Sequence, residues 1–324
     1  MKLQQLRYLW EVHGNALNVS ATAEKLFTSQ PGISKQIRLL EEELGIDLFA
    51  RNGKQFTGLT PAGMQILRLS GEILSKVKDI REIANDFHKQ ESGMLAIATT
   101  HTQARYALPK VIQMFVRRYP GIRLTIHQGT PSQIAEQVSK GLVDLAIATE
   151  ATDLFENLIT MPCYQWNRSV LVPHDHPLTR TEPVTLEAVA QHPIITYTFG
   201  FTGRSQLDLA FEAAGLKPQL ALTAVDADVI KTYVRLGLGI GIVAHMAYHP
   251  ELDQDLVALE AAHLFAPSTT KVVVRKDAYL RHCLYEFIGM MAPHLTPDRI
   301  KAAIEQPERK ALDALFRDIE LPVQ

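Results

Sequence analysis

At 324 residues the chain is longer than one average domain, which predicts two or three folded units. A hydrophobic content of 46% and a charged content of 21% exclude a chain that is disordered throughout. Lys and Arg total 33 against 35 for Asp and Glu, and the formal net charge of −2 gives no overall attraction to a polyanion. Any nucleic-acid site must therefore be local.

The sequence also indicates in which cellular compartment the protein is expected. Cys163 and Cys283 are too few for a disulfide framework or a cysteine zinc finger. The first residues lack the apolar core of a signal peptide, and apolar runs such as 94–98 and 240–244 fall far short of the roughly 20 residues that span a bilayer. We expect a cytoplasmic protein without a membrane segment.

Hydrophobic periodicity divides the chain into three parts. Residues 1–59 read as short helices with turn signals, and residues 61–87 as one long amphipathic helix. Residues 94–292 alternate short apolar runs with helical patterns, as in α/β proteins, and a polar, helical tail follows from Pro293. The expected fold is a small helical head, a helical connector and a large α/β body.

The third helix of the head has a polar face. It opens after Ser29, tolerates Pro31 in its first turn and ends before Gly45. Its predicted buried stripe comprises Ile33, Ile37, Leu40 and Leu44. The opposite face then presents Gln30, Ser34, Lys35 and Arg38. Such side chains contact base edges and phosphates, so this pattern predicts a recognition helix.

Features on either side extend this surface. Ser20 is placed to cap the preceding helix, which carries Leu26 and Phe27. Beyond the third helix, Asn52-Gly53 suits a type I′ hairpin. Arg51 and Lys54 on that hairpin would form a wing along the phosphate backbone. The alternative is that the polar face is only the solvated side of a three-helix unit.

The connector helix begins at an N-cap, Thr60, followed by Pro61. Its apolar residues recur at mostly three- and four-residue spacing: Ile66, Leu69, Ile73, Val77, Ile80 and Phe87. A helix of about 40 Å is longer than a small head needs for its own core. We expect it to pair with the same helix of a second chain, the alternative being that it packs on its own body.

In the body, polar side chains follow apolar strands. Thr100, Thr102 and Gln103 come after one strand, and Thr149 after another. A strand–helix–strand order implies a parallel sheet, which binds ligands at the carboxyl ends of its strands. A second loop, residues 199–205 with Thr202, precedes a helix whose N-terminus suits an anion or carboxylate. The alternative reading of each threonine is an ordinary N-cap.

Enzyme motifs are incomplete. Residues 237–241 lack the third glycine of a dinucleotide loop, and Gly203-Arg204-Ser205 lacks the second glycine of a nucleophile elbow. The pair in His174-Asp175-His176 precedes a proline in a loop, an unsuitable setting for metal ligands. Cys163 has no evident base and is expected to be a packed thiol. We expect no catalytic residue, no metal and no cofactor.

The head and body together carry a family resemblance. The head resembles the winged helix-turn-helix of LysR-type transcriptional regulators in residues 18–23, 27–37, 40–41, 44–45, 48–51 and 59–63. Residues 97–106, 197–205 and 228–235 are similar to the cysteine-biosynthesis branch of that family, and so is the tail 318–322 except at Glu320. The alkanesulfonate branch shares much of this pattern, but residues 30–32 and 199–202 resemble the cysteine-biosynthesis branch more closely. The resemblance covers nearly the whole chain.

The resemblance implies an α/β fold with three parts. These are a winged helix-turn-helix DNA-binding domain at residues 1–59, a linker and dimerisation helix at 60–90, and an effector-binding domain at 91–324 that is two-lobed like periplasmic binding proteins. Within it, lobe I takes about 91–163 plus 266–292, lobe II about 164–265, and a tail 293–324. An exported solute-binding protein, the other class for such a body, is disfavoured by the missing signal segment.

It also implies a function. The expected protein is an activator of sulfate-assimilation genes that responds to N-acetylserine or O-acetylserine, with sulfate or thiosulfate competing. Its partners would be promoter DNA, RNA polymerase and further copies of itself in a dimer of dimers. The residues that match the family's effector pocket are Thr100, Thr102, Gln103, Thr149 and Thr202, and Trp166 stands where the family places a tryptophan important to the response. A regulator of sulfonate utilisation or another sulfur-linked regulon is the alternative.

Overall fold

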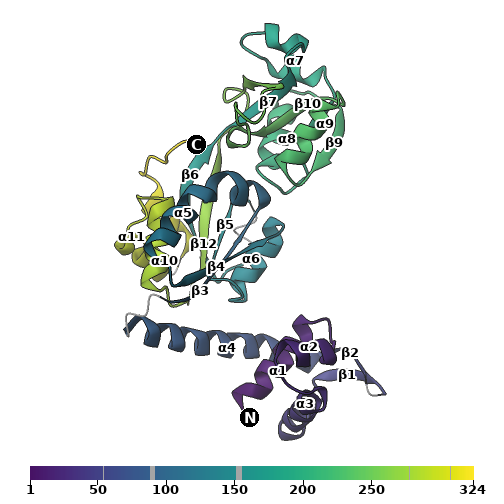
Figure 1. Ribbon diagram of the computed structural model, residues 1–324, viewed down its shortest axis with the longest axis vertical. Helices are drawn as coiled ribbons and strands as arrows, with labels where there is room; N and C mark the ends of the chain where they lie inside the picture. The colour runs from purple at the N-terminus through teal and green to yellow at the C-terminus, as the bar shows by residue number, and fades with distance from the viewer. Residues whose placement is uncertain (54, 88–91, 151–154, 277, 307) are drawn as a thin grey trace. The chain divides into compact units, whose positions relative to one another are not determined.

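The computed structural model describes residues 1–324 except 54, 88–91, 151–154, 277 and 307. The chain forms two compact units, residues 1–88 and 89–324. Each unit encloses a hydrophobic core of its own. Figure 1 shows the helices and strands of the two units. No helix in the part of the chain that the structure describes is both long and apolar enough to cross a membrane.

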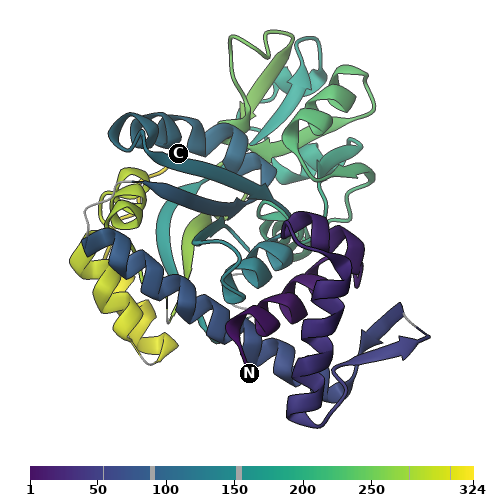
Figure 2. The ribbon, with the colours of Figure 1, turned by 60° about the horizontal axis from the view of Figure 1, so that its bottom comes forward.

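The first unit contains short helices, a hairpin and one long helix. In chain order they are α1 (Leu3–Gly14), α2 (Val19–Lys25), α3 (Gln30–Leu44), β1 (Phe49–Asn52), β2 (Gln55–Leu59) and α4 (Pro61–Phe87). Leu9, Ile33 and Ile37 are fully buried in the core that these elements share. The hairpin projects beside α3 (Figure 2). This order of elements matches the sequence prediction.

The ends of α3 and α4 follow the predicted capping chemistry. The Ser29 hydroxyl accepts a hydrogen bond from the Gly32 N–H at 3.2 Å. Gly45 ends α3 in the left-handed region at φ +71°, a conformation that favours glycine. At the start of α4, the Thr60 hydroxyl accepts from the Gly63 N–H at 2.9 Å. The sequence therefore located both helices correctly.

Two predictions at the second helix are wrong. The cap is Asn18, whose side chain accepts from the Ala21 N–H at 3.0 Å, while Ser20 already lies inside α2 and is exposed. Asn18 is the N-cap because its backbone is extended, as an N-cap residue requires. Phe27 lies beyond the end of α2 with φ +51°, and 98% of it is exposed.

Two further details of the head differ from prediction. Leu44 is 38% exposed, because α3 ends there; Glu41 takes a buried position on that face instead. Asn52 pairs with Gln55 as the last residue of β1, so the hairpin turn begins after Asn52 rather than at it. Gly53 has the positive φ, +61°. Lys54 lies outside the described residues.

Helix α4 has one packed side and one open side. Leu67 is buried against the head, and Gly71 fits against the Trp10 ring so closely that a Cβ there would overlap it. Several of its other apolar side chains are exposed: Met64, Leu69, Ile73, Ile80, Ile83 and Phe87. Ile66 and Val77 lie between these extremes. The apolar stripe predicted for a partner helix is therefore largely unburied in this chain.

The second unit begins with lobe I, a five-stranded sheet in the order β4-β3-β5-β12-β6. Its elements are β3 (Gly93–Thr99), a π-helical turn η1 (Gln103–Ala107), α5 (Leu108–Arg118), β4 (Ile122–Gln128), α6 (Pro131–Ser139), β5 (Leu145–Ala148), β6 (Leu158–Trp166), β12 (Ser268–Arg275), α10 (His282–Met291), α11 (Pro297–Glu305) and α12 (Arg309–Phe316). One face of the sheet buries a core with α5, α10, α11 and α12, and the other face buries one with α6.

Lobe II is a second five-stranded sheet, in the order β11-β7-β10-β8-β9. Its elements are β7 (Arg168–Pro173), η2 (Pro177–Arg180), α7 (Leu186–Ala190), β8 (Ile194–Tyr197), α8 (Arg204–Ala213), β9 (Leu220–Ala224), α9 (Ala227–Arg235), β10 (Ile240–Ala244), η3 (His245–Ala247) and β11 (Leu256–Glu260). Helices α8 and α9 cover opposite faces through separate cores.

The prediction of parallel sheets holds for part of each lobe. Strands β4, β3 and β5 are parallel, as are β9, β8 and β10. The strands next to the lobe crossings are antiparallel: β12 to β5 and β6, and β7 to β10 and β11. The chain passes from β6 to β7 through Asn167 alone and returns between β11 and β12. These strands run against their neighbours because they carry the chain out of one lobe and back.

Candidate functional sites

The exposed side of α3 presents the predicted DNA-contacting types. Lys35 and Arg38 are exposed and Ser34 is half-buried, while Ser29, Gln30 and Pro31 lie exposed at the helix start. Among the described residues, the Arg38 guanidinium forms an ion pair with Glu42 alone, one turn along the helix, at 2.8 Å. A hollow between α3 and the hairpin is lined by residues that include Gln30, Ser34, Arg38 and Gly53. This face can donate hydrogen bonds and positive charge to a polyanion.

A buried carboxylate joins α3 to the hairpin. Glu41, 5% exposed, accepts hydrogen bonds from the N–H groups of Leu48 and Phe49 at 2.8 and 3.2 Å. Its second oxygen binds the Arg51 guanidinium, which also lies 3.5 Å from Asp47. Arg51 is therefore partly neutralised before any DNA arrives. Sequence reasoning missed Glu41, because a glutamate in an amphipathic helix is usually solvated.

The predicted effector residues come together where the two lobes meet. Thr100, Thr102 and Thr202 are all at most 6% exposed. The hydroxyl oxygens of Thr102 in lobe I and Thr202 in lobe II lie 3.4 Å apart. Thr202 has φ +43°, a conformation that a threonine rarely adopts, and such strain clusters at functional sites. Two loops that are 100 residues apart in sequence thus form one polar cluster.

Gln103 and Thr149 belong to the same cluster through residues that the sequence did not single out. The Gln103 side chain donates to the Thr270 hydroxyl at 3.2 Å and accepts from the Tyr164 hydroxyl. Thr149 lies 3.3 Å from the same Thr270 oxygen. Because β12 and β6 pair Thr270 with Tyr164, the sheet register brings these partners together. Nothing local in the sequence marks either residue.

A buried cation adjoins this cluster. Arg168, 3% exposed, donates to the Gly203 carbonyl at 2.6 Å and to the Ser268 hydroxyl at 2.8 Å. In the described part of the chain no carboxylate pairs with it directly. Burial lowers the pKa of Arg168 to about 10, so the guanidinium stays charged at pH 7. The site therefore holds a positive charge whose hydrogen-bond partners are all neutral.

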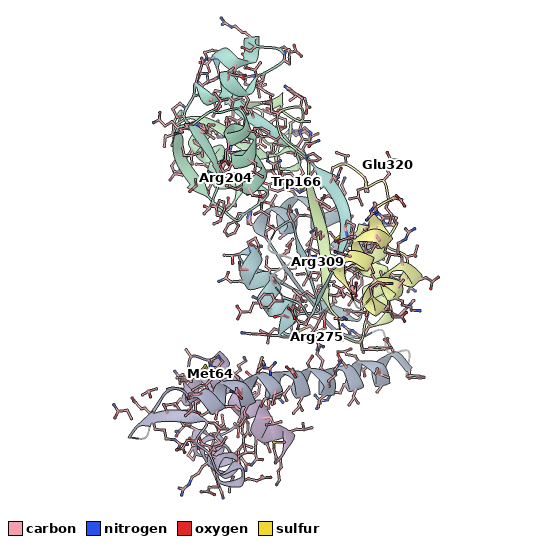
Figure 3. The ribbon with its side chains drawn as sticks, turned by 180° about the vertical axis from the view of Figure 1, so that it is seen from behind. Met64, Trp166, Arg204, Arg275, Arg309 and Glu320 are labelled. Atoms are coloured by element: carbon pink, nitrogen blue, oxygen red, sulfur yellow. The ribbon has the colours of Figure 1, made fainter. Side chains whose placement is uncertain are left out.

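Trp166 lies directly before the lobe crossing, on the strand that enters it (Figure 3). Its side chain is fully buried, and the Arg168 guanidinium lies 5.0 Å from its ring centroid. Its Nε1 has no hydrogen-bond partner among the described residues. Gly203, in the left-handed region at φ +69°, fits against Trp166, Arg168 and Ser268 so closely that a Cβ would overlap them. Lobe II thus closes tightly onto this corner.

A second contact links the lobes at the edge of the cluster. The Ser205 hydroxyl, at the start of α8, donates to Glu150 at 2.8 Å. Glu150 follows Thr149 directly and is half-buried. Its charge opposes any anion that enters the cluster and favours the charged form of Arg168. The backbone N–H groups of Arg204 and Gln206 are used in local turns, so the start of α8 offers fewer free donors than the sequence suggested.

The rejected enzyme motifs have structural roles. His174 bonds to the Gln254 carbonyl, and the His176 side chain accepts from the Leu178 N–H. A Cβ at Gly239 would overlap the Pro193 carbonyl, which shows close packing there. Cys163 is fully buried, and burial raises the pKa of its thiol to about 12. A thiol with this pKa stays protonated at neutral pH.

Comparisons with known proteins identify the two parts of the chain. Residues 3–64 match the model of the bacterial regulatory helix-turn-helix proteins of the lysR family, and residues 88–296 match the LysR substrate binding domain. The chain belongs to the LysR family. It is a transcriptional regulator that combines a DNA-binding domain with a small-molecule effector domain.

Two named relatives of this LysR-type regulator match more than nine-tenths of its length. It is 50% identical over 321 residues to the HTH-type transcriptional regulator CysB of Haemophilus influenzae, covering 99% of both chains. It is also 50% identical to the regulator SsuR of Burkholderia cenocepacia, covering 94% of this chain and 99% of that one. The cofactor-binding domain of the Cbl transcriptional regulator is 43% identical with a TM-score of 0.65, covering 67% of this chain and 96% of that structure.

Proposed function

We propose that this LysR-type regulator activates genes of sulfate assimilation and cysteine biosynthesis in response to N-acetylserine or O-acetylserine, with sulfate or thiosulfate competing for the same site. The observation that supports this proposal is the set of neutral hydrogen-bond donors that converge from both lobes beside the buried Arg168 guanidinium. Such a site favours binding of a small anion or carboxylate, because the donors and the guanidinium stabilise its negative charge and no carboxylate of the described residues is bonded to the arginine in competition.

Each effector residue has a proposed role. Thr100, Thr102 and Thr149 donate from lobe I, together with the Gln103 amide, and Thr202 donates from lobe II. Trp166 offers its unpartnered Nε1–H and stiffens the corner where the chain changes lobe. The effector then favours closed lobes, because only closure brings Thr102 and Thr202 within reach of one ligand. The coupling cannot exceed the ligand's differential affinity for the two arrangements.

We further propose the DNA-binding roles. Ser34, Lys35 and Arg38 read a half-site in the major groove. Ser20, Ser29, Gln30 and Pro31 lie near the phosphates, with Arg51 and Lys54 on the wing. Two copies joined through the exposed stripe of α4 form a dimer, and two dimers joined by their bodies bend promoter DNA for RNA polymerase. We take residues 1–59, 60–90 and 91–324 as the three functional parts, in a protein that works in the cytoplasm.

A titration tests the effector assignment. Full-length protein is titrated by calorimetry with N-acetylserine, O-acetylserine, sulfate and thiosulfate, and a sulfate-assimilation promoter is followed in a parallel gel-shift assay. Saturable N-acetylserine or O-acetylserine binding that alters the promoter complex, with sulfate competing, is the expected result. Promoter binding that ignores all four ligands would reject this effector class.

The alternative is a regulon of sulfonate utilisation or another sulfur source. Relatives named CysB and SsuR are both 50% identical to this chain, so identity does not choose between them. Binding to a sulfonate-utilisation promoter, with sulfate but neither acetylserine as ligand, would support this alternative.

A further inference from the structure

Three potential metal ligands meet between the lobes, beside the effector cluster. His101 comes from the loop after β3 in lobe I, while Asp226 and Asp228 stand at the start of α9 in lobe II. One ligand atom from each lies within 4.8 Å of the other two, and all three side chains are half-buried. Zinc with bonds of about 2.1 Å holds its ligands roughly 3.4 Å apart, so side-chain shifts of about 1 Å would complete the triangle.

The imidazole of His101 supplies an independent observation. Its Nδ1 is buried and has no hydrogen-bond partner among the described residues. A buried polar atom without a partner is uncommon in folded proteins and costs about 1–3 kcal/mol. This unsatisfied nitrogen belongs to the same imidazole ring that offers a ligand atom to the cluster. The flanking residues Thr100 and Thr102 both belong to the effector cluster, and so does the next residue, Gln103.

The two carboxylates keep acceptor capacity for an ion. Asp226 uses one oxygen to cap α9, accepting from the Val229 N–H at 2.9 Å. Asp228 accepts from the Tyr106 hydroxyl at 2.8 Å and pairs with the Arg105 guanidinium at 2.6 Å. A carboxylate offers about four lone-pair sites, so each aspartate retains unused ones.

Two cationic side chains lie near the three potential ligands, and neither prevents an ion from binding there. Lys231 lies 3.5 Å from Asp228, but it is held at 3.0 Å by both Asp253 and the Ala247 carbonyl. The Arg105 side chain is 52% exposed, and exposed ion pairs contribute little to stability. Arg105 can therefore turn into solvent when a divalent ion arrives, although its charge opposes the ion while it stays.

We propose that His101, Asp226 and Asp228 bind one divalent transition-metal ion, with zinc as the probe, and that this ion links the two lobes. An imidazole among the ligands favours zinc over magnesium or calcium, which prefer oxygen alone. Water would fill the fourth position. Because the ligands come from both lobes, the ion would bind the closed arrangement and hold it closed. The proposal does not depend on which effector the regulator senses.

Calorimetry of metal-free, full-length protein with zinc chloride, in the absence of effector, tests the site. The expected result is one tight zinc ion per chain and no comparable binding of magnesium. His101→Ala should weaken this binding by at least tenfold. His127→Ala, which removes an exposed histidine on β4, is the matched control and should bind zinc as the original chain does.

Two more variants distinguish coordination from a general loss of structure. Asp226→Asn keeps a good N-cap for α9 but removes the charged ligand, so zinc should bind at least tenfold more weakly while the fold is retained. Arg105→Ala removes the opposing charge and should tighten zinc binding severalfold. Equal zinc affinity in the original chain, His101→Ala and Asp226→Asn would overturn the proposal, as would weaker binding in Arg105→Ala.

Discussion

The hydroxyl oxygens of Thr102 and Thr202 lie 3.4 Å apart, across the boundary between the two lobes. Each residue is almost fully buried, and each follows a different strand of a different sheet. Both lobes therefore contribute side chains to the polar cluster. Binding of an effector at this cluster, as proposed, would therefore depend on whether the two lobes are closed.

Removing one of these hydroxyls should weaken effector binding without unfolding the chain. Thr202→Ala removes a donor that contributes about 1 kcal/mol, so calorimetry with N-acetylserine and sulfate should show affinities about fivefold lower. Thr181→Ala, at an exposed threonine of lobe II, is the control and should leave both affinities unchanged. Unaltered binding in Thr202→Ala would move the effector site elsewhere.

The charge of Glu150 should limit affinity for anions. Glu150→Gln keeps an oxygen that accepts from Ser205 but removes the negative charge, so sulfate should bind about fivefold more tightly. Calorimetry at two salt concentrations measures this gain, which should shrink at high salt. Glu212→Gln, near the far end of α8, should not change sulfate affinity. A weaker affinity in Glu150→Gln would contradict the anion-site assignment.

Arg38 and Arg68 form a matched pair for testing DNA recognition. Both are exposed, and both pair with a glutamate one turn along their helix, Glu42 and Glu72 respectively. Arg38→Ala should lower promoter affinity by about five- to a hundredfold in gel-shift assays, because a lost base or phosphate contact costs about 1–3 kcal/mol. Arg68→Ala should retain promoter binding. Effector affinity should stay unchanged in both variants.

Gly63 should tolerate no side chain. A Cβ at this position of α4 would overlap the Leu48 carbonyl oxygen, and backbone cannot yield as a flexible side chain does. Gly63→Ala should therefore unfold or displace the hairpin and abolish promoter binding while effector binding persists. Gly58→Ala is the control, since a Cβ there meets nothing within 4 Å. Normal promoter binding by Gly63→Ala would contradict this packing.

Asp253 should make lobe II sensitive to acid. Burial alone would raise its pKa, but hydrogen bonds from the His249 N–H, Arg235 and Lys231 outweigh burial and hold the pKa below its usual value. The carboxylate therefore contributes stability above the ordinary aspartate pKa, and this contribution is lost as pH falls through the lowered pKa.

Chemical unfolding at several pH values tests this linkage. Asp253→Asn should destabilise lobe II by roughly 3 kcal/mol at pH 7, since it leaves Lys231 buried without its main partner. The difference from the original chain should narrow as the pH falls from the ordinary aspartate pKa to the lowered pKa at which folded Asp253 takes up a proton. Asp255→Asn alters a more exposed partner of Arg235 and should cost much less. A constant difference at every pH would contradict the assignment.

Local chemistry made much of the fold predictable. Ser29, Gly45 and Thr60 mark helix ends through hydrogen bonds within a few residues, so their roles are readable in sequence. The prediction that Ser20 caps α2 was wrong because Asn18 and Ser20 are both good N-cap residues, and only the backbone conformation decides between them. Thr270 and Tyr164 could not be found, because strand pairing across more than 100 residues brings them to Gln103.

The buried Glu41 carboxylate has a mechanical consequence. By accepting hydrogen bonds from the Leu48 and Phe49 N–H groups and from the Arg51 guanidinium, it joins α3 to the hairpin. If α3 and the hairpin both contact DNA as proposed, the spacing between these two contacts is fixed. In that case, a change in DNA curvature would have to come from a change in the separation of whole DNA-binding domains, and not from a movement of α3 relative to its own hairpin.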